Sequence, residues 1–359
     1  MVVTAGGGRL SGPPVCGARW ASDAATRVSA PRAAGGCVDD HGFQNYLGTD
    51  NDEDNKDDDD GEDHMTRETG DGLRGRNDPE HPEHAELAEL TGGLRRFADA
   101  LATSGGKLAR SMLGELRSSA LDSRSKSSAT DPVTVIDTAV EERLRTEIAA
   151  HRPGDQMLGE EGGEYRGPGE GGRVRWVVDP VDGTVNLLYG IPFTAVSVAA
   201  ELDGVVVAGV VHNIVTAETW TARVDGGAHY RVGDGGAEKV TVSDREDLSL
   251  ALVGTGFAYD AGIRAEQGNT VAGLLPRVRD IRRCGSAALD LCMVASGRLD
   301  AYYERCLQPW DYAAGALIAY EAGAIVAVSD DDRVPTTASA PGVASDFLTT
   351  LGELSGRSH

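Results

Sequence analysis

Two aspartates that lie three residues apart, at the end of an apolar run, constrain this chain more than any other feature. The run at residues 176–178 predicts a short buried strand, and the turn that follows it predicts the start of a helix. The carboxylates of Asp179 and Asp182 would repel each other unless a divalent cation lay between them. The backbone amides of Gly183 and Thr184, at a helix N-terminus, would favour an anion. The stretch therefore predicts a metal-dependent phosphoryl site, with an acidic helix cap as the alternative.

Charge and cysteine content argue against several classes of function. The 359 residues carry a formal net charge of −23, and no basic stripe indicates a nucleic-acid or membrane footprint. The five cysteines are odd in number and show no C-x-x-C spacing, which favours a reduced protein without structural disulfides. No secretory signal opens the chain, and no apolar run is long enough to span a membrane. We therefore expect a cytoplasmic protein.

Residues 1–84 are expected to form a disordered, acidic extension. They are rich in Gly, Ala and Pro at first, and rich in Asn and Asp from residue 50 to residue 63. Such a composition offers too few apolar side chains to offset the entropy of ordering. A calcium site is the alternative, but the segment lacks the gapped aspartates and the closing glutamate of a calcium loop. Translation could also start at Met65, after the acidic block.

Helical spacing dominates before the aspartate pair, and strands alternate with helices after it. Apolar residues repeat at helical spacing from about residue 85 to residue 112, and again at Val140, Leu144 and Ile148. Together the elements predict an α+β (mixed α/β) fold, with helices sandwiching mixed sheets in two joined halves. Beyond the pair we expect antiparallel strands at 193–200, 205–211 and 218–222, further strands at 252–256, 301–304 and 325–328 (the last clear one), and helices at 286–295 and 310–322.

Six short blocks, taken together, are more specific than any one of them. They are K-S-S-A-T-D-P-V-T-V-I-D at 126–137, L-G-E-E-G at 158–162, D-P-V-D-G-T-V-N at 179–186, G-S-A-A-L-D at 285–290, D-A-Y-Y-E at 300–304 and W-D-Y-A-A-G at 310–315. In order and spacing they resemble the inositol monophosphatase family of magnesium-dependent phosphatases, and most of all its bacterial SuhB-type inositol-1-monophosphatases. The resemblance covers roughly residues 85–355.

The resemblance implies a fold and a domain organisation. The fold would be a layered α-β-α-β-α sandwich of the inositol monophosphatase/fructose-1,6-bisphosphatase type. The catalytic domain would span residues 85–359, with an α+β half at about 85–240 and an α/β half at about 241–359. A homodimer that is sensitive to lithium and acts on a small phosphomonoester would be expected.

The resemblance also implies the site residues. Glu160, Asp179 and the carbonyl of Val181 would hold a first Mg2+, and Asp179 would bridge to a second Mg2+ that Asp182 and Asp311 complete. The catalytic residues would be Glu160 and Thr184, which orient the attacking water with Asp137 behind them, and Asp182. The residues expected to bind substrate are Lys126, Gly183, Thr184, Gly285, Ser286, Ala287, Glu304 and Asp311.

The sequence constrains the substrate less than it constrains the phosphatase reaction. Residues 305–309 depart from the family pattern, because Cys306 stands where members usually have glycine. Glu304 and the small residues at 285–287 favour myo-inositol 1-phosphate or a similar polyol phosphate, whereas relatives act on histidinol phosphate, adenosine 3',5'-bisphosphate or fructose bisphosphate. A partner in transcription complexes is the alternative from another class. Asp182, Thr184 and Asp311 are all present, which favours an enzyme over a protein that only binds partners.

Overall fold

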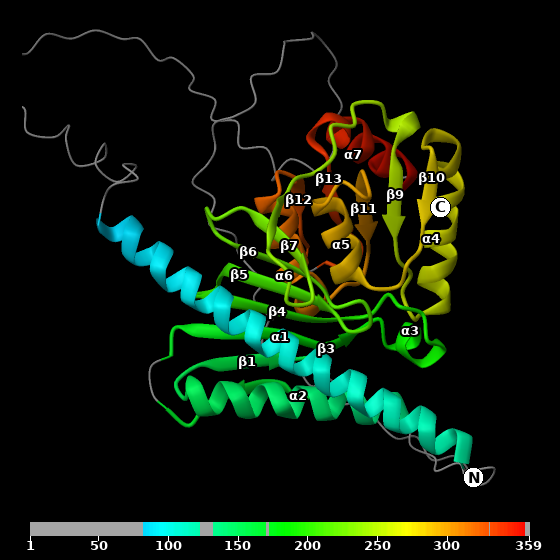
Figure 1. Ribbon diagram of the computed structural model, residues 1–359. Helices are drawn as coiled ribbons and strands as arrows, with labels where there is room; N and C mark the ends of the chain where they lie inside the picture. Colours follow the sequence, from blue (N-terminus) through cyan, green and yellow to red (C-terminus); the bar gives the residue numbers. More distant parts are fainter. Residues whose placement is uncertain (1–81, 123–131, 170–171, 330, 356–359) are drawn as a thin grey trace, which may run out of the picture. The chain divides into compact units, whose positions relative to one another are not determined.

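Two β-sheets, with helices outside and between them, make up the part of the protein that the computed structural model describes (Figure 1). This part comprises residues 82–122, 132–169, 172–329 and 331–355. The predicted acidic extension lies outside the described residues up to residue 81, and so does Lys126. From residue 83 onward the described residues belong to one compact unit. None of the helices in these ranges is long and apolar enough to span a membrane.

Two helices cover one face of the larger sheet: α1 (Pro82–Asp122) and α2 (Pro132–His151). Both were predicted from their apolar spacing, and the side chains that repeat in it are buried together. Leu94 of α1 packs in one cluster with Val140 and Leu144 of α2 and with the sheet beneath them. Gly106 lets α1 approach this sheet closely, because a Cβ at this position would lie 2.4 Å from Cδ2 of His212.

The larger sheet has eight strands in the order β2-β1-β3-β4-β5-β6-β7-β8. Every neighbouring pair is antiparallel except β1 and β3, which are parallel. The meander predicted after the aspartate pair is confirmed as β4, β5 and β6. The strands are β1 (Gln156–Gly159), β2 (Gly163–Arg166), β3 (Val174–Asp182), β4 (Ala195–Leu202), β5 (Val205–Asn213), β6 (Glu218–Arg223), β7 (Ala228–Val232) and β8 (Glu238–Val240).

The smaller sheet is mixed and has the order β10-β9-β11-β13-β12. Strand β9 is parallel to both β10 and β11, whereas β13 is antiparallel to β11 and β12. Its strands are β9 (Leu252–Thr255), β10 (Asp280–Arg282), β11 (Ala301–Glu304), β12 (Ile325–Ala327) and β13 (Thr336–Ser339).

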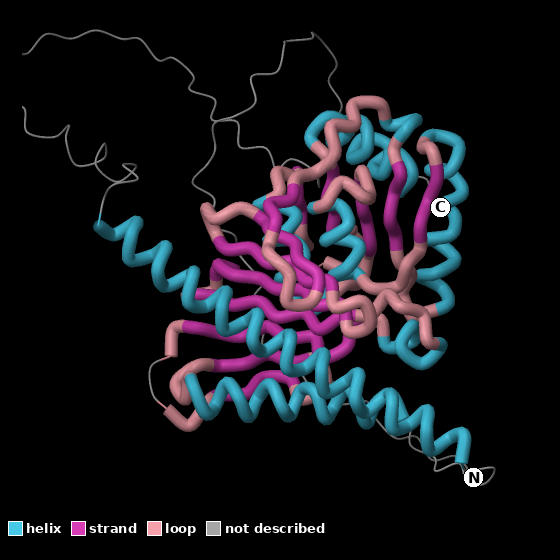
Figure 2. The backbone as a smooth tube through the Cα atoms, viewed as in Figure 1, coloured by secondary structure: helices cyan, strands magenta, loops and turns pink. Residues whose placement is uncertain are grey.

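Five layers result, in the order α-β-α-β-α, which confirms the predicted class of fold (Figure 2). Two helices lie between the sheets, where Leu291 and Leu317 share one buried cluster with Trp220 of the larger sheet and Tyr302 of the smaller one. Two other helices pack on the outer face of the smaller sheet. The inner helices are α5 (Ala287–Ala295) and α6 (Pro309–Glu321), the outer ones are α4 (Ala261–Leu274) and α7 (Pro341–Ser355), and a short α3 (Thr184–Tyr189) follows β3.

Some elements differ from expectation. Residues 325–328 are not the last strand, because β13 follows; its buried residues are mostly Thr and Ser, so it lacks the apolar signal of a strand. Helix α4 buries only Gln267 and Leu274 and therefore shows no clear amphipathic pattern. Helix α7 was not predicted either, although its buried Val343, Phe347 and Leu351 have helical spacing.

Candidate active site

The aspartate pair lies at an irregularity of β3. Asp179 is paired with Ser197 of β4, and Asp182 with Ala195, so three steps along β3 correspond to two along β4. In a regular strand, residues three apart point to opposite faces of the sheet. Ser197 and Ala195 are two apart and share a face, so the extra residue brings both aspartates to one side. The local geometry of a β-bulge therefore makes the two carboxylates converge.

Hydrogen bonds fix each carboxylate of this pair. Oδ1 of Asp179 accepts from the amide of Val181 at 2.9 Å. Oδ2 of Asp182 accepts from Oγ of Ser286 at 2.6 Å and from the amide of Ala288 at 2.8 Å. Asp182 therefore joins the end of β3 to the start of α5, although the two are about a hundred residues apart in sequence.

Four acids of the site lie close enough to perturb one another. Burial is the main cause that raises the pKa of Asp179 well above its usual value, and Asp182, Glu160 and Asp311 raise it further. Burial also raises the pKa of Asp311, again with Asp182 and Glu160 contributing. Burial raises the pKa of Asp182 to about 6, although its hydrogen bonds act in the opposite direction. Acids that resist ionisation together form a site that a cation would stabilise.

Glu160 and Asp311 reach this cluster from separate elements. Glu160 lies in the turn between β1 and β2, and its side chain forms a hydrogen bond with Asp179. Burial is the largest cause that raises its pKa. Asp311 lies in the first turn of α6, where Oδ2 accepts from the amide of Gln308 at 2.7 Å. Three distant segments thus supply one group of carboxylates.

The residues after Asp182 form the predicted turn and helix. Gly183 has φ +88°, and a Cβ there would lie 2.9 Å from the carbonyl oxygen of Phe193, so only glycine fits easily. Oγ1 of Thr184 donates to the carbonyl oxygen of Val181 at 2.9 Å. Asp137 is buried on α2, which packs against both β3 and α3.

The residues expected to contact the alcohol lie at the start of α5, which is hydrogen-bonded to Asp182, and at the end of β11. Gly285 has φ +94°, Ser286 caps the N-terminus of α5, and Ala287 is the first residue of that helix. At the end of β11, Oε2 of Glu304 accepts from the hydroxyl of Tyr302 at 2.6 Å. Burial raises the pKa of Glu304 to about 7.

Asn186 is a residue of this site to which the sequence assigned no role. Its side-chain amide is buried and donates to the carbonyls of Phe193, at 2.7 Å, and Cys284, at 2.8 Å. It thereby holds α3 against the turn that contains Gly285. The signal was present, because Asn186 ends the block D-P-V-D-G-T-V-N, but an asparagine in a helix gave no reason to expect a bridge.

The donors of this site suit a hard divalent cation. Carboxylate oxygens and a backbone carbonyl are the ligands that Mg2+ prefers, and Mg2+ usually keeps several waters beside one or two carboxylates. Within the described ranges, no group of three or more acidic, His or Cys side chains is already spaced to hold an ion. The fit to Mg2+ therefore rests on the chemistry of the donors, which are the carboxylates of Glu160, Asp179, Asp182 and Asp311 and the carbonyl of Val181.

The structure thus brings most of the predicted residues into one neighbourhood. Lys126 lies outside the described residues. Trp310, which precedes Asp311, is partly buried and packs against the central apolar cluster. Cys306 adopts φ +67°, a conformation typical of glycine. Asp137 is buried on α2, which packs against β3 and α3. The other predicted residues lie in or beside the acid cluster: Glu160, Asp179, Val181, Asp182, Gly183, Thr184, Gly285, Ser286, Ala287, Glu304 and Asp311.

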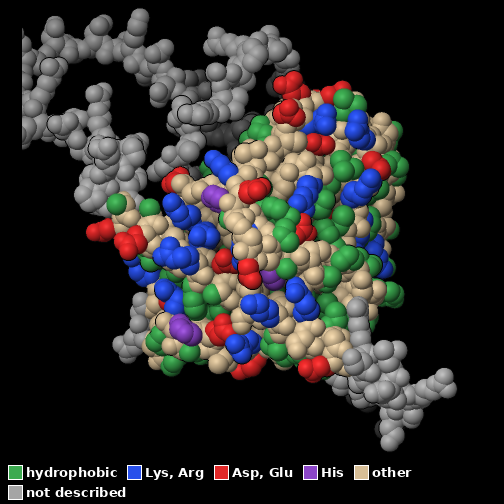
Figure 3. Space-filling view, in the orientation of Figure 1, with side chains coloured by type: hydrophobic (Ala, Val, Ile, Leu, Met, Phe, Trp, Pro, Cys, Tyr) green, Lys and Arg blue, Asp and Glu red, His purple; other side chains and the backbone are tan. Residues whose placement is uncertain are grey.

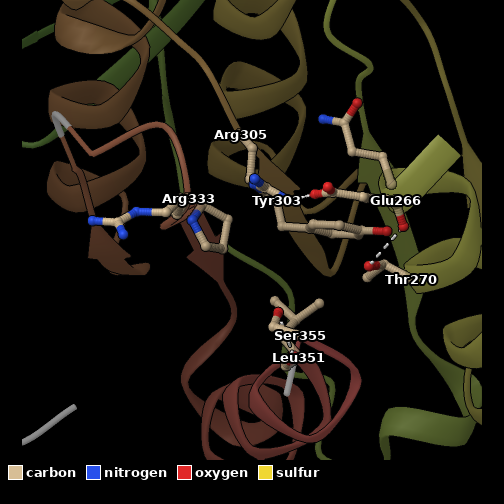
Figure 4. A pocket seen from close by; sticks show the side chains of 9 residues that line it. Glu266, Thr270, Tyr303, Arg305, Arg333, Leu351 and Ser355 are labelled. Carbon is tan, nitrogen blue, oxygen red and sulfur yellow. Dashed lines mark hydrogen bonds and ion pairs between the residues drawn. The ribbon is translucent and has the colours of Figure 1, made fainter. Parts of the chain in front are cut away.

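A separate cavity of about 200 Å³ lies beside β11, between α4 and α7 (Figure 4). Tyr303, Arg305 and Arg333 line it, but both arginines are already paired. Arg305 contacts Glu266 at 3.2 Å, and Arg333 contacts a neighbouring aspartate at 2.8 Å. None of the predicted site residues lines this cavity, so it is distinct from the acid cluster.

Comparisons with known proteins agree with the sequence blocks. Residues 93–351 match the inositol monophosphatase family. An inositol-1-monophosphatase of Mycobacterium leprae is 48% identical over 279 residues, which are 73% of this chain and 94% of that protein. The solved structure of Mycobacterium tuberculosis SuhB is 44% identical, has a TM-score of 0.64, and aligns over 73% of this chain and 97% of that one. A Pseudomonas aeruginosa protein named Nus factor SuhB is 40% identical over 201 residues, 55% of this chain and 72% of that protein.

Fold and similarity together define the class of this protein, which is an enzyme of the phosphoric monoester hydrolase type. More narrowly, the chain belongs to the inositol monophosphatase family. The resemblance found in the sequence, including that to SuhB-type members, is confirmed.

Proposed function

We propose that this phosphatase hydrolyses myo-inositol 1-phosphate, or a similar polyol phosphate, to the alcohol and inorganic phosphate, with Mg2+ as its cofactor. The position of Asp182 carries the proposal. Its carboxylate belongs to the acid cluster and also accepts hydrogen bonds from Ser286 and Ala288. A phosphate bound beside the acid cluster would therefore have its alcohol group over the small residues at the start of α5.

The residues of the chain have separate tasks in this reaction. When bound, Mg2+ would offset the charge of the phosphate and act as a Lewis acid. The amides of Gly183 and Thr184 would hold phosphate oxygens. Because Oγ1 of Thr184 donates its own proton to Val181, its lone pairs stay available to accept a hydrogen bond from the attacking water. The proposed Mg2+ ligands are Glu160, Asp179, the Val181 carbonyl, Asp182 and Asp311.

Glu160 and Asp137 complete the proposed handling of the water. The carboxylate of Glu160, which lies beside Asp179, would orient the attacking water. Asp137, buried on the helix that packs against α3, would support Thr184 from behind.

Glu304 is the proposed contact for the hydroxyl groups of the substrate. Tyr302 fixes one of its oxygens and leaves the other available to accept from a hydroxyl. Burial strengthens such a hydrogen bond because competing water is excluded. A ring rich in hydroxyls fits this arrangement better than the amine of histidinol phosphate or the base of adenosine 3',5'-bisphosphate.

A phosphate-release panel tests the proposal. Inositol 1-phosphate, histidinol phosphate, adenosine 3',5'-bisphosphate and fructose 1,6-bisphosphate would be compared at equal concentration with Mg2+ and with a chelator in its place. We expect the highest kcat/KM with inositol 1-phosphate and loss of turnover in chelator. A higher kcat/KM with another member of the panel would show that the proposed substrate is wrong. Full turnover in chelator would exclude Mg2+ as the cofactor.

The name of the Pseudomonas aeruginosa relative, Nus factor SuhB, supports a second candidate function as a partner in transcription complexes. On the face in Figure 3, Lys and Arg side chains are scattered among acidic and apolar ones, which supports a protein partner more than nucleic acid. If this were the main role, Asp182→Asn would abolish turnover while leaving capture of transcription proteins unchanged. A cytoplasmic homodimer and inhibition by lithium are further parts of the proposal, taken over from the resemblance.

A further inference from the structure

We propose that Glu141 is a positioning residue that holds the turn carrying Glu160, so that Glu160 can serve as a metal ligand. Glu141 lies on α2, one helical turn after Asp137, and belongs to none of the six sequence blocks. The inference rests on the proposed Mg2+-dependent function, since Glu160 is one of the proposed ligands.

A direct hydrogen bond links Glu141 to this turn. Glu141 is 2% exposed, and its Oε2 accepts from the backbone amide of Glu161 at 2.8 Å. Glu161 directly follows Glu160 in the turn between β1 and β2. A buried carboxylate that accepts from a backbone amide fixes that peptide, and with it the direction of the preceding side chain.

The carboxylate of Glu141 leaves no space for a side chain at the two glycines of this turn. A Cβ at Gly159 would lie 2.6 Å from Oε2 of Glu141, and a Cβ at Gly162 would lie 2.5 Å from Oε1. Side chains at either position would therefore push Glu141 out of its place. The glycine-flanked acidic turn that is apparent in the sequence is thus built closely around Glu141, rather than being merely a flexible loop.

The charge of Glu141 is not explained by an ion pair. Among the described residues, no Lys, Arg or His forms an ion pair with it, and Arg145, one turn further on, is paired with Glu142 instead. Its charge adds to the repulsion that raises the pKa of Glu160. A buried carboxylate without an ion pair costs stability, and positioning of a neighbouring ligand is the role that the contacts support.

Metal binding and hydrogen exchange test this role without relying on turnover. Binding of Mn2+, which takes similar oxygen ligands, would be followed through the electron paramagnetic resonance signal of the free ion, with Mg2+ as competitor. For Glu141→Ala we expect the Kd of Mn2+ to rise about tenfold or more. Exchange of the Glu161 amide should become faster in the same variant. Glu141→Gln keeps an acceptor oxygen and should bind Mn2+ nearly as the wild type does.

Glu142→Ala is the matched control, because Glu142 is its exposed neighbour on α2 and should change neither measurement. If Glu141→Ala does not fold, Gly162→Ala disturbs the same contact and should weaken Mn2+ binding in the same way. Unchanged Mn2+ affinity in a folded Glu141→Ala variant would overturn the inference. Equal weakening by Gln and Ala would also overturn it, since charge alone would then matter. If the wild type bound no Mn2+ or Mg2+, the proposed function itself would fail.

Discussion

Adding one methyl group at Gly256 should disturb substrate recognition and leave phosphate chemistry intact. Gly256 follows β9 and lies against the carboxylate of Glu304. An ideal Cβ at this position would lie 1.9 Å from Oε2, 2.0 Å from Cδ and 2.1 Å from Oε1 of Glu304. Carbon contacts normally lie at about 3.5 Å or more, so Gly256→Ala must displace this carboxylate by roughly 1.5 Å.

The magnitude follows from the hydrogen bonds that this displacement breaks. Glu304 would lose its 2.6 Å contact with Tyr302 and its proposed contacts with substrate hydroxyls. Charge-assisted hydrogen bonds contribute about 1.5–3 kcal/mol each. We therefore expect kcat/KM for inositol 1-phosphate to fall about ten- to a hundredfold.

The assay compares two substrates. An aryl phosphate without ring hydroxyls should be hydrolysed at nearly the wild-type rate, because the acid cluster is untouched. Gly268→Ala is the control: Gly268 lies in α4, where an added methyl group would meet no other segment within 4 Å, so this variant should leave both activities unchanged. If Gly256→Ala slowed both substrates equally, Glu304 would belong to the general catalytic apparatus. If it slowed neither, Glu304 would not be the polyol contact.

Three further predictions concern the cluster, the loop after Glu304 and the core. Asp182→Asn should nearly abolish phosphate release while the thermal midpoint stays close to that of the wild type; substantial turnover at saturating Mg2+ would contradict the proposed ligands. Cys306→Gly should relieve the positive φ and raise stability by about 1 kcal/mol in denaturant unfolding, whereas a loss would mean that the thiol contributes packing. Burial lowers the pKa of His212 to about 4, so the unfolded chain binds its proton more tightly. Stability should therefore fall by about 3 kcal/mol as the pH drops from 6.5 to 4, and His212→Gln should flatten this dependence.

Sequence periodicity predicted the elements whose buried faces are apolar. Helices α1 and α2 follow this rule through the helical spacing of their apolar residues. Strands β3 to β5 are buried on both faces and show nearly continuous apolar runs, whereas β6 alternates Trp220 and Ala222 with threonine. Strand β13 shows neither pattern, since Thr336, Thr337 and Ser339 are buried polar residues. In helix α4 most of the surface faces solvent, so no pattern marks it.

The sequence predicted the acidic residues of the candidate site, but not the buried polar residues that hold its segments in place. Asp179 and Asp182 stand out because two neighbouring carboxylates need an explanation, and the family resemblance placed Glu160 and Asp311 beside them. Asn186 and Glu141 gave no such signal. A polar residue on a helix usually faces solvent, and only tertiary contacts reveal that these two are buried and hold other segments.

The irregularity in β3 makes the site depend on the number of residues as much as on their identity. Removing Val181 would restore regular pairing with β4 and leave both aspartates on one face, but it would also remove the amide that donates to Asp179 and the carbonyl that is a proposed Mg2+ ligand. Substitutions here would keep this backbone amide and carbonyl, whereas a deletion of one residue would remove the bulge that presents them. Natural length variation among relatives should accordingly be confined to other segments, and a protein engineer who grafts this site must transfer the whole stretch from Asp179 to Asp182 without a change in length.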